Sequence, residues 1–240
     1  MKKNILLTVL AVIFVGLSAV AEESSINAWG RKKYFNVGYG IQTLENKDNG
    51  MKWKSDIAVS LVKGTTYYLH SKPILGMIKF GIDWTQVDLN YAKLKEDFVR
   101  EDIENAPSDF EEFVGKKDWG QHQLEYSMHV GPSITVNPVN YLKINAYFRY
   151  APSFSAVLYN DANEDMQFSG AFANYFVTGG AVSWKIISLG AEYRWGSAKY
   201  KTFSFDDESV TDDIDPTDVI KTAKQKMNTS SVRFYVSLRF

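Results

Sequence analysis

The last ten residues of the chain constrain its fold more than any other stretch. From Ser231 to Phe240 they read SVRFYVSLRF, with an apolar side chain at every second position and polar or amphipathic ones between. A period of two is the pattern of a β-strand with one face in an apolar medium and the other in a polar medium. The edge strand of a soluble sandwich is the alternative. A strand with five apolar side chains on one face favours the wall of a membrane barrel.

The amino-terminal stretch predicts export. Lys2 and Lys3 are followed by an almost wholly apolar run, Ile5 to Leu17, and by Ala19-Val20-Ala21, which has the small-x-small form of a cleavage site. We expect residues 1–21 to be a secretory signal peptide and residues 22–240 to be one barrel domain. An uncleaved transmembrane helix is the alternative, but the run is shorter than the roughly 20 residues that a span needs.

Composition narrows the possible classes. The chain has no cysteine, so we expect no disulfides, and its net charge of −1 gives no electrostatic argument for binding nucleic acid. No later stretch is apolar enough for a membrane helix. A membrane protein of this composition has to close its strands into a barrel, because only closure satisfies every backbone group in lipid.

Alternating segments predict an all-β fold, a transmembrane up-and-down antiparallel β-barrel of eight strands. The links after strands one, three, five and seven are mostly long and polar, and those after strands four and six are about three residues. Outer-membrane barrels show this asymmetry. Residues 64–76 are the exception, predicted as a long periplasmic connection, with a longer, bent strand pair as the alternative. The expected strands are approximately residues 34–44, 53–61, 77–90, 119–137, 141–154, 172–184, 188–200 and 230–240.

Two local features are predicted in and after the third strand. The outward apolar series that ends at Trp84 resumes at Val87, one residue out of phase, so we expect a β-bulge near Thr85-Gln86. The charged loop that follows could contain a helix from Ala92 to Asn105.

The carboxyl terminus carries a family resemblance. Phe240, preceded by the apolar Leu238 and Val236, resembles the assembly signal of bacterial outer-membrane β-barrel proteins. The mature chain as a whole resembles the small OmpA-like and OmpX-like barrels. This resemblance implies insertion by the barrel-assembly machinery, removal of the signal peptide on export, location in the bacterial outer membrane and contact with its lipid.

Inward positions of the predicted strands would form a charged lumen. The interior of an eight-stranded barrel is only wide enough for side chains to fill, so we predict a polar core of paired charges. A narrow ion pathway built on the same pairs is the alternative. The predicted lumen charges are Asp56, Lys79, Asp83, Glu125, Lys143, Arg149, Glu192, Arg194, Arg233 and Arg239.

The three histidines, His70, His122 and His129, are the candidate catalytic residues of this sequence. Lipid-modifying enzymes on small barrels use a His with a Ser and often a carboxylate. His122, near the outer end of the fourth strand, could form such a site with a loop Ser or Asp, whereas His70 and His129 lie in a connection and in the lumen. No motif of those enzymes matches. The acidic loop within residues 201–229 lacks calcium-loop spacing and is interpreted as solvated. We therefore predict no catalytic residue, metal or cofactor.

The predicted function is that of a non-enzymatic outer-membrane barrel that supports envelope integrity or surface interaction through its extracellular loops, because binding residues tend to lie on loops held by a rigid scaffold. A narrow channel or passive transporter is the first alternative, and a lipid-modifying enzyme the second. No nucleic-acid partner is expected, and no extracellular ligand can be named.

Overall fold

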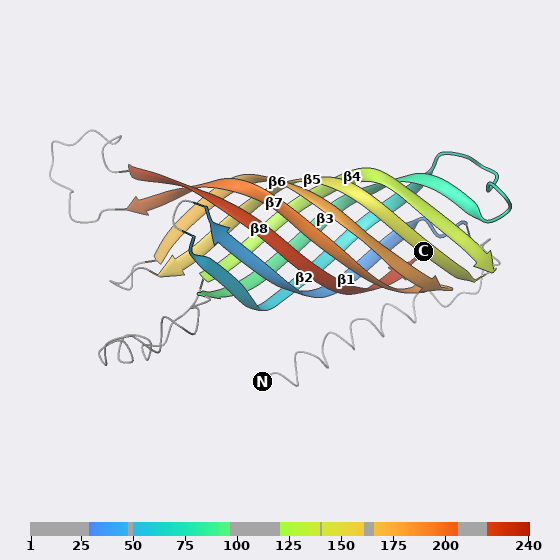
Figure 1. Cartoon of the computed structure of the whole chain (residues 1–240), viewed down its shortest axis with the longest axis horizontal. Coiled ribbons are helices and arrows are strands. Elements are labelled where there is room, and N and C mark those ends of the chain that lie inside the picture. The colour runs from blue at the N-terminus through green and yellow to red at the C-terminus, as the bar shows by residue number, and fades with distance from the viewer. Residues whose placement is uncertain (1–28, 48–49, 97–120, 140, 161–165, 206–219) are drawn as a thin grey trace.

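The computed structural model describes residues 29–47, 50–96, 121–139, 141–160, 166–205 and 220–240, and these form a closed barrel of eight antiparallel strands (Figure 1). Each strand pairs with its neighbours in the sequence. The strands are β1 (Lys33–Asn46), β2 (Lys52–Tyr68), β3 (Ile78–Glu96), β4 (Gln121–Val139), β5 (Leu142–Asn160), β6 (Met166–Trp184), β7 (Ile187–Phe205) and β8 (Ile220–Arg239). The signal-peptide prediction lies outside the described residues. No helix within them is long and apolar enough to cross a membrane.

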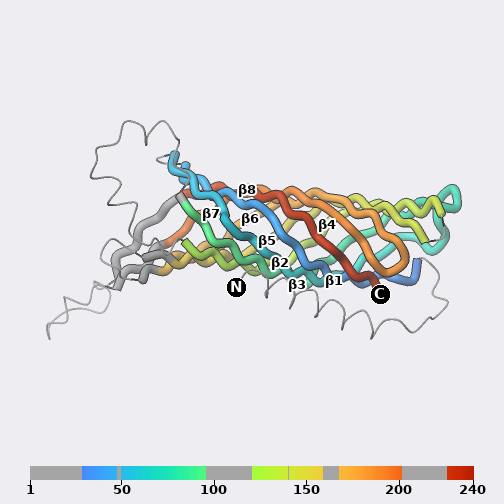
Figure 2. Tube along the Cα trace, turned by 90° about the horizontal axis from the view of Figure 1, so that it is seen from below, coloured from blue at the N-terminus to red at the C-terminus, as the bar shows by residue number. Residues whose placement is uncertain are grey.

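The first and last strands close the barrel. β1 pairs with β8 along its length, from Tyr34 opposite Arg239 to Asn46 opposite Met227, and Figure 2 shows the blue and red strands side by side. At the seam, the Lys33 N–H donates to the Phe240 oxygen at 2.9 Å and the Phe240 N–H donates to the Lys33 oxygen at 3.1 Å. Closure leaves no unpaired edge. The predicted fold class is confirmed.

The two ends of the barrel differ in their connections. At one end, here called the turn end, short segments join β2 to β3, β4 to β5 and β6 to β7, and the chain's last residue lies there (Figure 1). The opposite end, here called the loop end, carries the connections that include residues 97–120, 161–165 and 206–219. The predicted asymmetry is confirmed for the long connections after β3 and β7 and for the short turns after β4 and β6. The connections after β1 and β5, residues 47–51 and 161–165, are shorter than predicted, and both are shorter than residues 69–77 at the turn end.

Most strands are longer than predicted, chiefly toward the loop end. β3 continues to Glu96, so the predicted helix is wrong for Ala92 to Glu96, and its remainder lies outside the described residues. Alternation of apolar and polar residues marks only the part of a strand whose outer face is apolar. Beyond that part the backbone pairing continues with polar outward side chains, such as Lys93 and Lys199, and the sequence pattern no longer differs from that of a loop.

The predicted connection over residues 64–76 is wrong, and the alternative of a longer strand pair is correct. Thr65 to Tyr68 belong to β2 and pair with β3 up to Gly81. Only a turn remains, which contains an isolated bridge between Ile74 and Ile78. Pro73 and the polar residues before it end the strand only after Tyr68, which is later than predicted.

Two β-bulges adjust the register of β2 and β3. The predicted bulge is confirmed, because Gly64 pairs with Thr85 while Lys63 pairs with Val87, which leaves Gln86 as the extra residue. A second bulge in β2 was not predicted. There Ser55 and Ile57 pair with consecutive residues of β3, and Asp56 is the extra residue.

The barrel wall is apolar outside and mostly polar inside. Large outward side chains such as Phe80, Trp84 and Phe234 are 45%, 48% and 63% exposed. Buried polar and charged side chains alternate with them. This inside-out distribution suits a wall surrounded by lipid.

Inward tyrosines are fitted into the narrow lumen by glycines on neighbouring strands. The shared feature is that each tyrosine sits directly opposite a glycine in the strand pairing. The pairs are Tyr34 with Gly64, Tyr147 with Gly179, Tyr175 with Gly196, and Tyr235 with Gly190. A Cβ added at any of these glycines would collide with the tyrosine opposite. The glycines therefore leave the space that the rings occupy.

Candidate functional site in the barrel lumen

The structure places most of the predicted lumen charges inside the barrel. They are buried side chains on inward positions of β3, β4, β5, β7 and β8: Lys79, Asp83, Glu125, Lys143, Arg149, Glu192, Arg194, Arg233 and Arg239. The prediction that Asp56 is a lumen charge is wrong. Its side chain is 48% exposed and lies 2.5 Å from Lys95 on the outer wall, because the bulge at this residue takes it out of the alternation.

A hydrogen-bonded group centred on Glu125 and Arg194 crosses the lumen between β4 and β7. Both side chains are fully buried and form an ion pair. Glu125 also accepts from the Tyr175 hydroxyl at 2.7 Å and from the Asn90 amide at 3.0 Å, while Arg194 donates to the Gln42 amide oxygen at 2.9 Å. The carboxylate thus has several donors, which compensates for its burial.

A second charged group lies around Asp88. Arg233 donates two hydrogen bonds to its carboxylate, at 3.0 and 2.9 Å, in the bidentate geometry that suits guanidinium and carboxylate. His129 Nε2 lies 3.1 Å from the same carboxylate. Arg233 Nε is also 3.0 Å from Glu192, whose other oxygen accepts from the Tyr147 hydroxyl at 2.8 Å. Five side chains from β3, β4, β5, β7 and β8 therefore meet at one level of the lumen.

A third pair, Asp83 and Arg149, lies closer to the turn end. Arg149 Nη2 donates to Asp83 at 2.6 Å, and Thr66 and Ser133 donate to the other oxygen at 2.7 and 3.0 Å. Gly131 on β4 pairs with Asp83 and lies beside the Arg149 backbone. Because this glycine has no side chain, Arg149 can reach across β4 to its partner on β3.

An apolar layer fills the lumen near the loop end, and the sequence did not indicate it. The shared feature of its members is burial on inward positions close to the loop ends of their strands. Its large members are Leu44, Trp53, Leu94, Val157 and Met227. Trp53, Leu94 and Met227 occur in stretches rich in charged or polar residues, so an outward apolar series was missing there and the inward face could not be recognised.

Asp88 was also missed, although the bulge that was predicted before it supplies the signal. Once Gln86 is counted as the extra residue, Asp88 alternates with the outward Leu89 and has to face inward. No local pattern identifies the partner of Asp88, because Arg233 lies on β8, far later in the chain.

The histidines do not meet in the structure. His129 contacts Asp88 in the lumen, His70 Nδ1 lies 2.6 Å from the Lys72 carbonyl in a turn, and His122 shares a hydrogen bond of 2.8 Å with the Tyr91 hydroxyl. Within the described parts of the chain, no three His, Cys, Asp or Glu side chains are grouped in a way that would hold a metal ion. The loop residues proposed as partners of His122 lie outside those parts.

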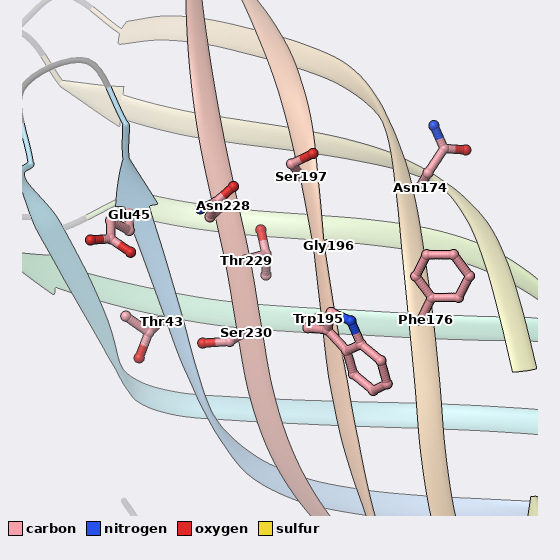
Figure 3. Close-up of a pocket in the computed structure, with 10 residues that line it drawn as sticks. All are labelled: Thr43, Glu45, Asn174, Phe176, Trp195, Gly196, Ser197, Asn228, Thr229 and Ser230. Carbon is pink, nitrogen blue, oxygen red and sulfur yellow. The ribbon is translucent and has the colours of Figure 1, made fainter. Parts of the chain in front are cut away.

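The outward wall has a hollow of about 510 Å³ near the loop end of β1, β6, β7 and β8 (Figure 3). Glu45, Asn228 and Ser197 lie on its polar side. On the other side are Trp195 and Phe176, whose ring centroids are 6.1 Å apart. The change from aromatic to polar residues indicates the boundary of the apolar belt, where aromatic girdles lie in membrane barrels.

Val236, Leu238 and Phe240, the predicted assembly signal, lie on the outward side of the wall at the turn end. Val236 is 38% and Phe240 is 44% exposed, whereas the alternating Ser237 and Arg239 are buried. This placement leaves the apolar side chains accessible from outside the barrel. Their role in assembly stays a prediction.

Comparison with known proteins finds similar solved structures but no sequence family. No family model and no curated protein sequence matches the chain. The match with Neisserial surface protein A covers 87% of this chain and 97% of that protein's chain, at 13% sequence identity and a TM-score of 0.43. The match with the outer membrane protease OmpT of Escherichia coli covers 87% of this chain and 97% of the protease chain, at 8% sequence identity and a TM-score of 0.45.

A third match is with the attachment invasion locus protein Ail of Yersinia pestis, whose structure was solved with a heparin analogue. This match covers 88% of this chain and 99% of the Ail chain, at 7% sequence identity and a TM-score of 0.39. At such identities and TM-scores the likenesses assign no family or activity to this chain. It is a closed eight-stranded antiparallel β-barrel, and small outer-membrane barrels are among the solved structures that it resembles.

Proposed function

We propose that this protein is a non-enzymatic barrel of the bacterial outer membrane that supports envelope integrity or surface interaction through the connections at its loop end. The observation that carries the proposal is the filled lumen. Three charged groups and an apolar layer follow one another along it, and in each charged group a buried carboxylate is paired with an arginine from across the lumen. A barrel filled in this way is a scaffold.

The outer wall supports the membrane part of the proposal. Its exposed apolar side chains alternate with buried polar ones, and aromatic contacts such as Phe148 with Phe176 and Tyr193 with Trp195 lie on its outward side. In water such a surface would aggregate, whereas in lipid it is favourable. The predicted signal peptide and assembly signal agree with an outer-membrane destination.

Replacing residues 97–120 and 206–219 with short turns tests the role of the connections. We expect the shortened barrel to fold, as judged by a gel mobility that shifts on heating, because the charged groups of the lumen lie outside these segments. The shortened barrel is expressed in a strain from which the natural gene has been deleted. That strain should remain as sensitive to large antibiotics, and attach to surfaces as weakly, as the deletion strain that expresses no barrel.

The matched control replaces only residues 161–165, at the same end of the barrel, and should restore the parent's behaviour. The proposal is wrong if the doubly shortened barrel restores both properties as fully as the parent, because the connections would then be dispensable.

A further inference from the structure

Three cationic side chains meet at the mouth of the lumen at the turn end. Lys79 is the second residue of β3, Lys143 is the second residue of β5, and Arg239 is the last residue of β8. They are only 6%, 4% and 5% exposed. Inward side chains at the ends of three strands thus bring three positive charges into one small, largely dehydrated region.

Within the described parts of the chain no carboxylate is paired with these three cations, in contrast to Arg149, Arg194 and Arg233. Lys79 Nζ donates to the Ser71 carbonyl at 2.6 Å, and Arg239 lies 5.6 Å from the Tyr34 ring centroid. Lys143 Nζ and Arg239 Nε have no hydrogen-bond partner within the described residues. Asp83, one group deeper, is already bound to Arg149.

The charges that act on Lys143 all have the same sign. They belong to Arg239, Arg31 and Lys79. At the same end, the Phe240 oxygen accepts the Lys33 N–H in the seam between β1 and β8. Burial of like charges without counter-charges is unfavourable, and a bound anion would remove the penalty.

Serine side chains follow Lys143 around the lumen wall along the strand pairing, from β6 to β8. Lys143 is opposite Ser183, Ser183 is opposite Ser188, and Ser188 is opposite Ser237 on β8. Ser188 donates to Ser183 at 2.7 Å, while the Ser237 hydroxyl has no partner within the described residues. Ser237 lies two residues before Arg239 on the inward face of β8, so its hydroxyl adds an uncharged donor near that cation.

We propose that the turn-end mouth binds an oxyanion of the phosphate class between Lys143, Arg239 and Lys79, with Ser237 as an additional donor. A phosphate group has several acceptor oxygens and carries enough charge to compensate more than one cation. Arginine binds it through a forked pair of N–H groups and lysine as a point charge, which matches the residues present. The phosphate can belong to a soluble compound or to a lipid headgroup.

Titration with inorganic pyrophosphate tests the proposal on the full mature chain, refolded in an uncharged, phosphate-free detergent. We expect saturable binding by calorimetry at one site per barrel, and at least tenfold weaker binding by Lys143→Gln. Lys72→Gln is the matched control, because it removes one positive charge from an exposed turn residue at the same end. Absence of saturable binding, or equal weakening by both substitutions, would overturn the proposal.

A stability measurement gives a second readout that does not depend on detecting the complex. Pyrophosphate should raise the urea midpoint of the parent, because a ligand that binds only the folded state stabilises it. Lys143→Met should unfold at a higher urea concentration than the parent without pyrophosphate, since it removes an uncompensated buried charge, and pyrophosphate should not raise its midpoint. A Lys143→Met barrel that is less stable and still responds to pyrophosphate contradicts the site.

Mixed micelles containing phosphatidylglycerol distinguish the two sources of phosphate. If the lipid competes with pyrophosphate in the parent, whereas phosphatidylcholine at the same mole fraction competes less, the site takes an anionic headgroup. If pyrophosphate binding is unchanged by either lipid, the site takes a soluble phosphate compound. Both results keep the oxyanion site and differ only in what supplies the anion.

Discussion

Replacing Arg194 with methionine is expected to lower the free energy of unfolding by about 3–5 kcal/mol. The substitution removes the guanidinium that pairs with Glu125 and donates to Gln42. Glu125 then stays as a buried carboxylate with neutral donors only. Urea unfolding of the refolded barrel in phospholipid vesicles, followed by tryptophan fluorescence, measures the loss.

A double-mutant cycle separates the ion pair from the loss of packing. Glu125→Gln in the Arg194→Met background should recover part of the stability, because no uncompensated charge is then buried. Lys199→Met is the matched control on the same strand, with an exposed outward side chain, and should change stability by less than about 0.5 kcal/mol. A loss below about 1 kcal/mol for Arg194→Met would mean that the pair does not hold β4 against β7.

Asp88→Asn is expected to lower the free energy of unfolding by about 3 kcal/mol or more, because it breaks a buried pair by removing one charge. Asp88 binds Arg233 through two hydrogen bonds and contacts His129, and it has no exposed surface. After the substitution Arg233 retains Glu192 as its only carboxylate neighbour within the described residues. The same urea experiment measures the effect.

Asp56→Asn serves as the matched control for this prediction. It changes the same chemical group, also in an ion pair, but the Asp56 and Lys95 side chains are about half exposed. Exposed pairs contribute about 0–1 kcal/mol, so the substitution should have a small effect. If both substitutions lower stability equally, burial of the lumen charges does not decide their contribution.

The alternation of residues was sufficient to predict the fold because the outer face of each strand is apolar over the width of a membrane. It also predicted the bulge at Gln86, where two correctly phased segments of β3 are separated by one extra residue. Strand ends beyond the apolar belt could not be predicted in this way. Outward lysines such as Lys199 are as common in loops, and only the pairing with β8 identifies them as strand residues.

The inward charges could be predicted as a group, but their partners could not. Pairing depends on the stagger of strands around the barrel, which no local pattern determines. Arg149 illustrates this point, because it passes Gly131 on the adjacent β4 and binds Asp83 on β3. Asp56 was misplaced because the outward residues before the bulge, Lys52 and Lys54, are polar, so no outward apolar series exists there to reveal the change of phase.

The closed lumen is the central claim, and single-channel conductance in planar bilayers tests it most directly. The refolded mature chain should be measured beside Glu192→Ala and Arg194→Ala, which remove charges at two levels of the lumen. We expect no discrete current steps from the parent, because paired side chains and the apolar layer fill its interior. Discrete openings of the parent whose size changes with either substitution would contradict the account, since the lumen charges would then line a conducting path.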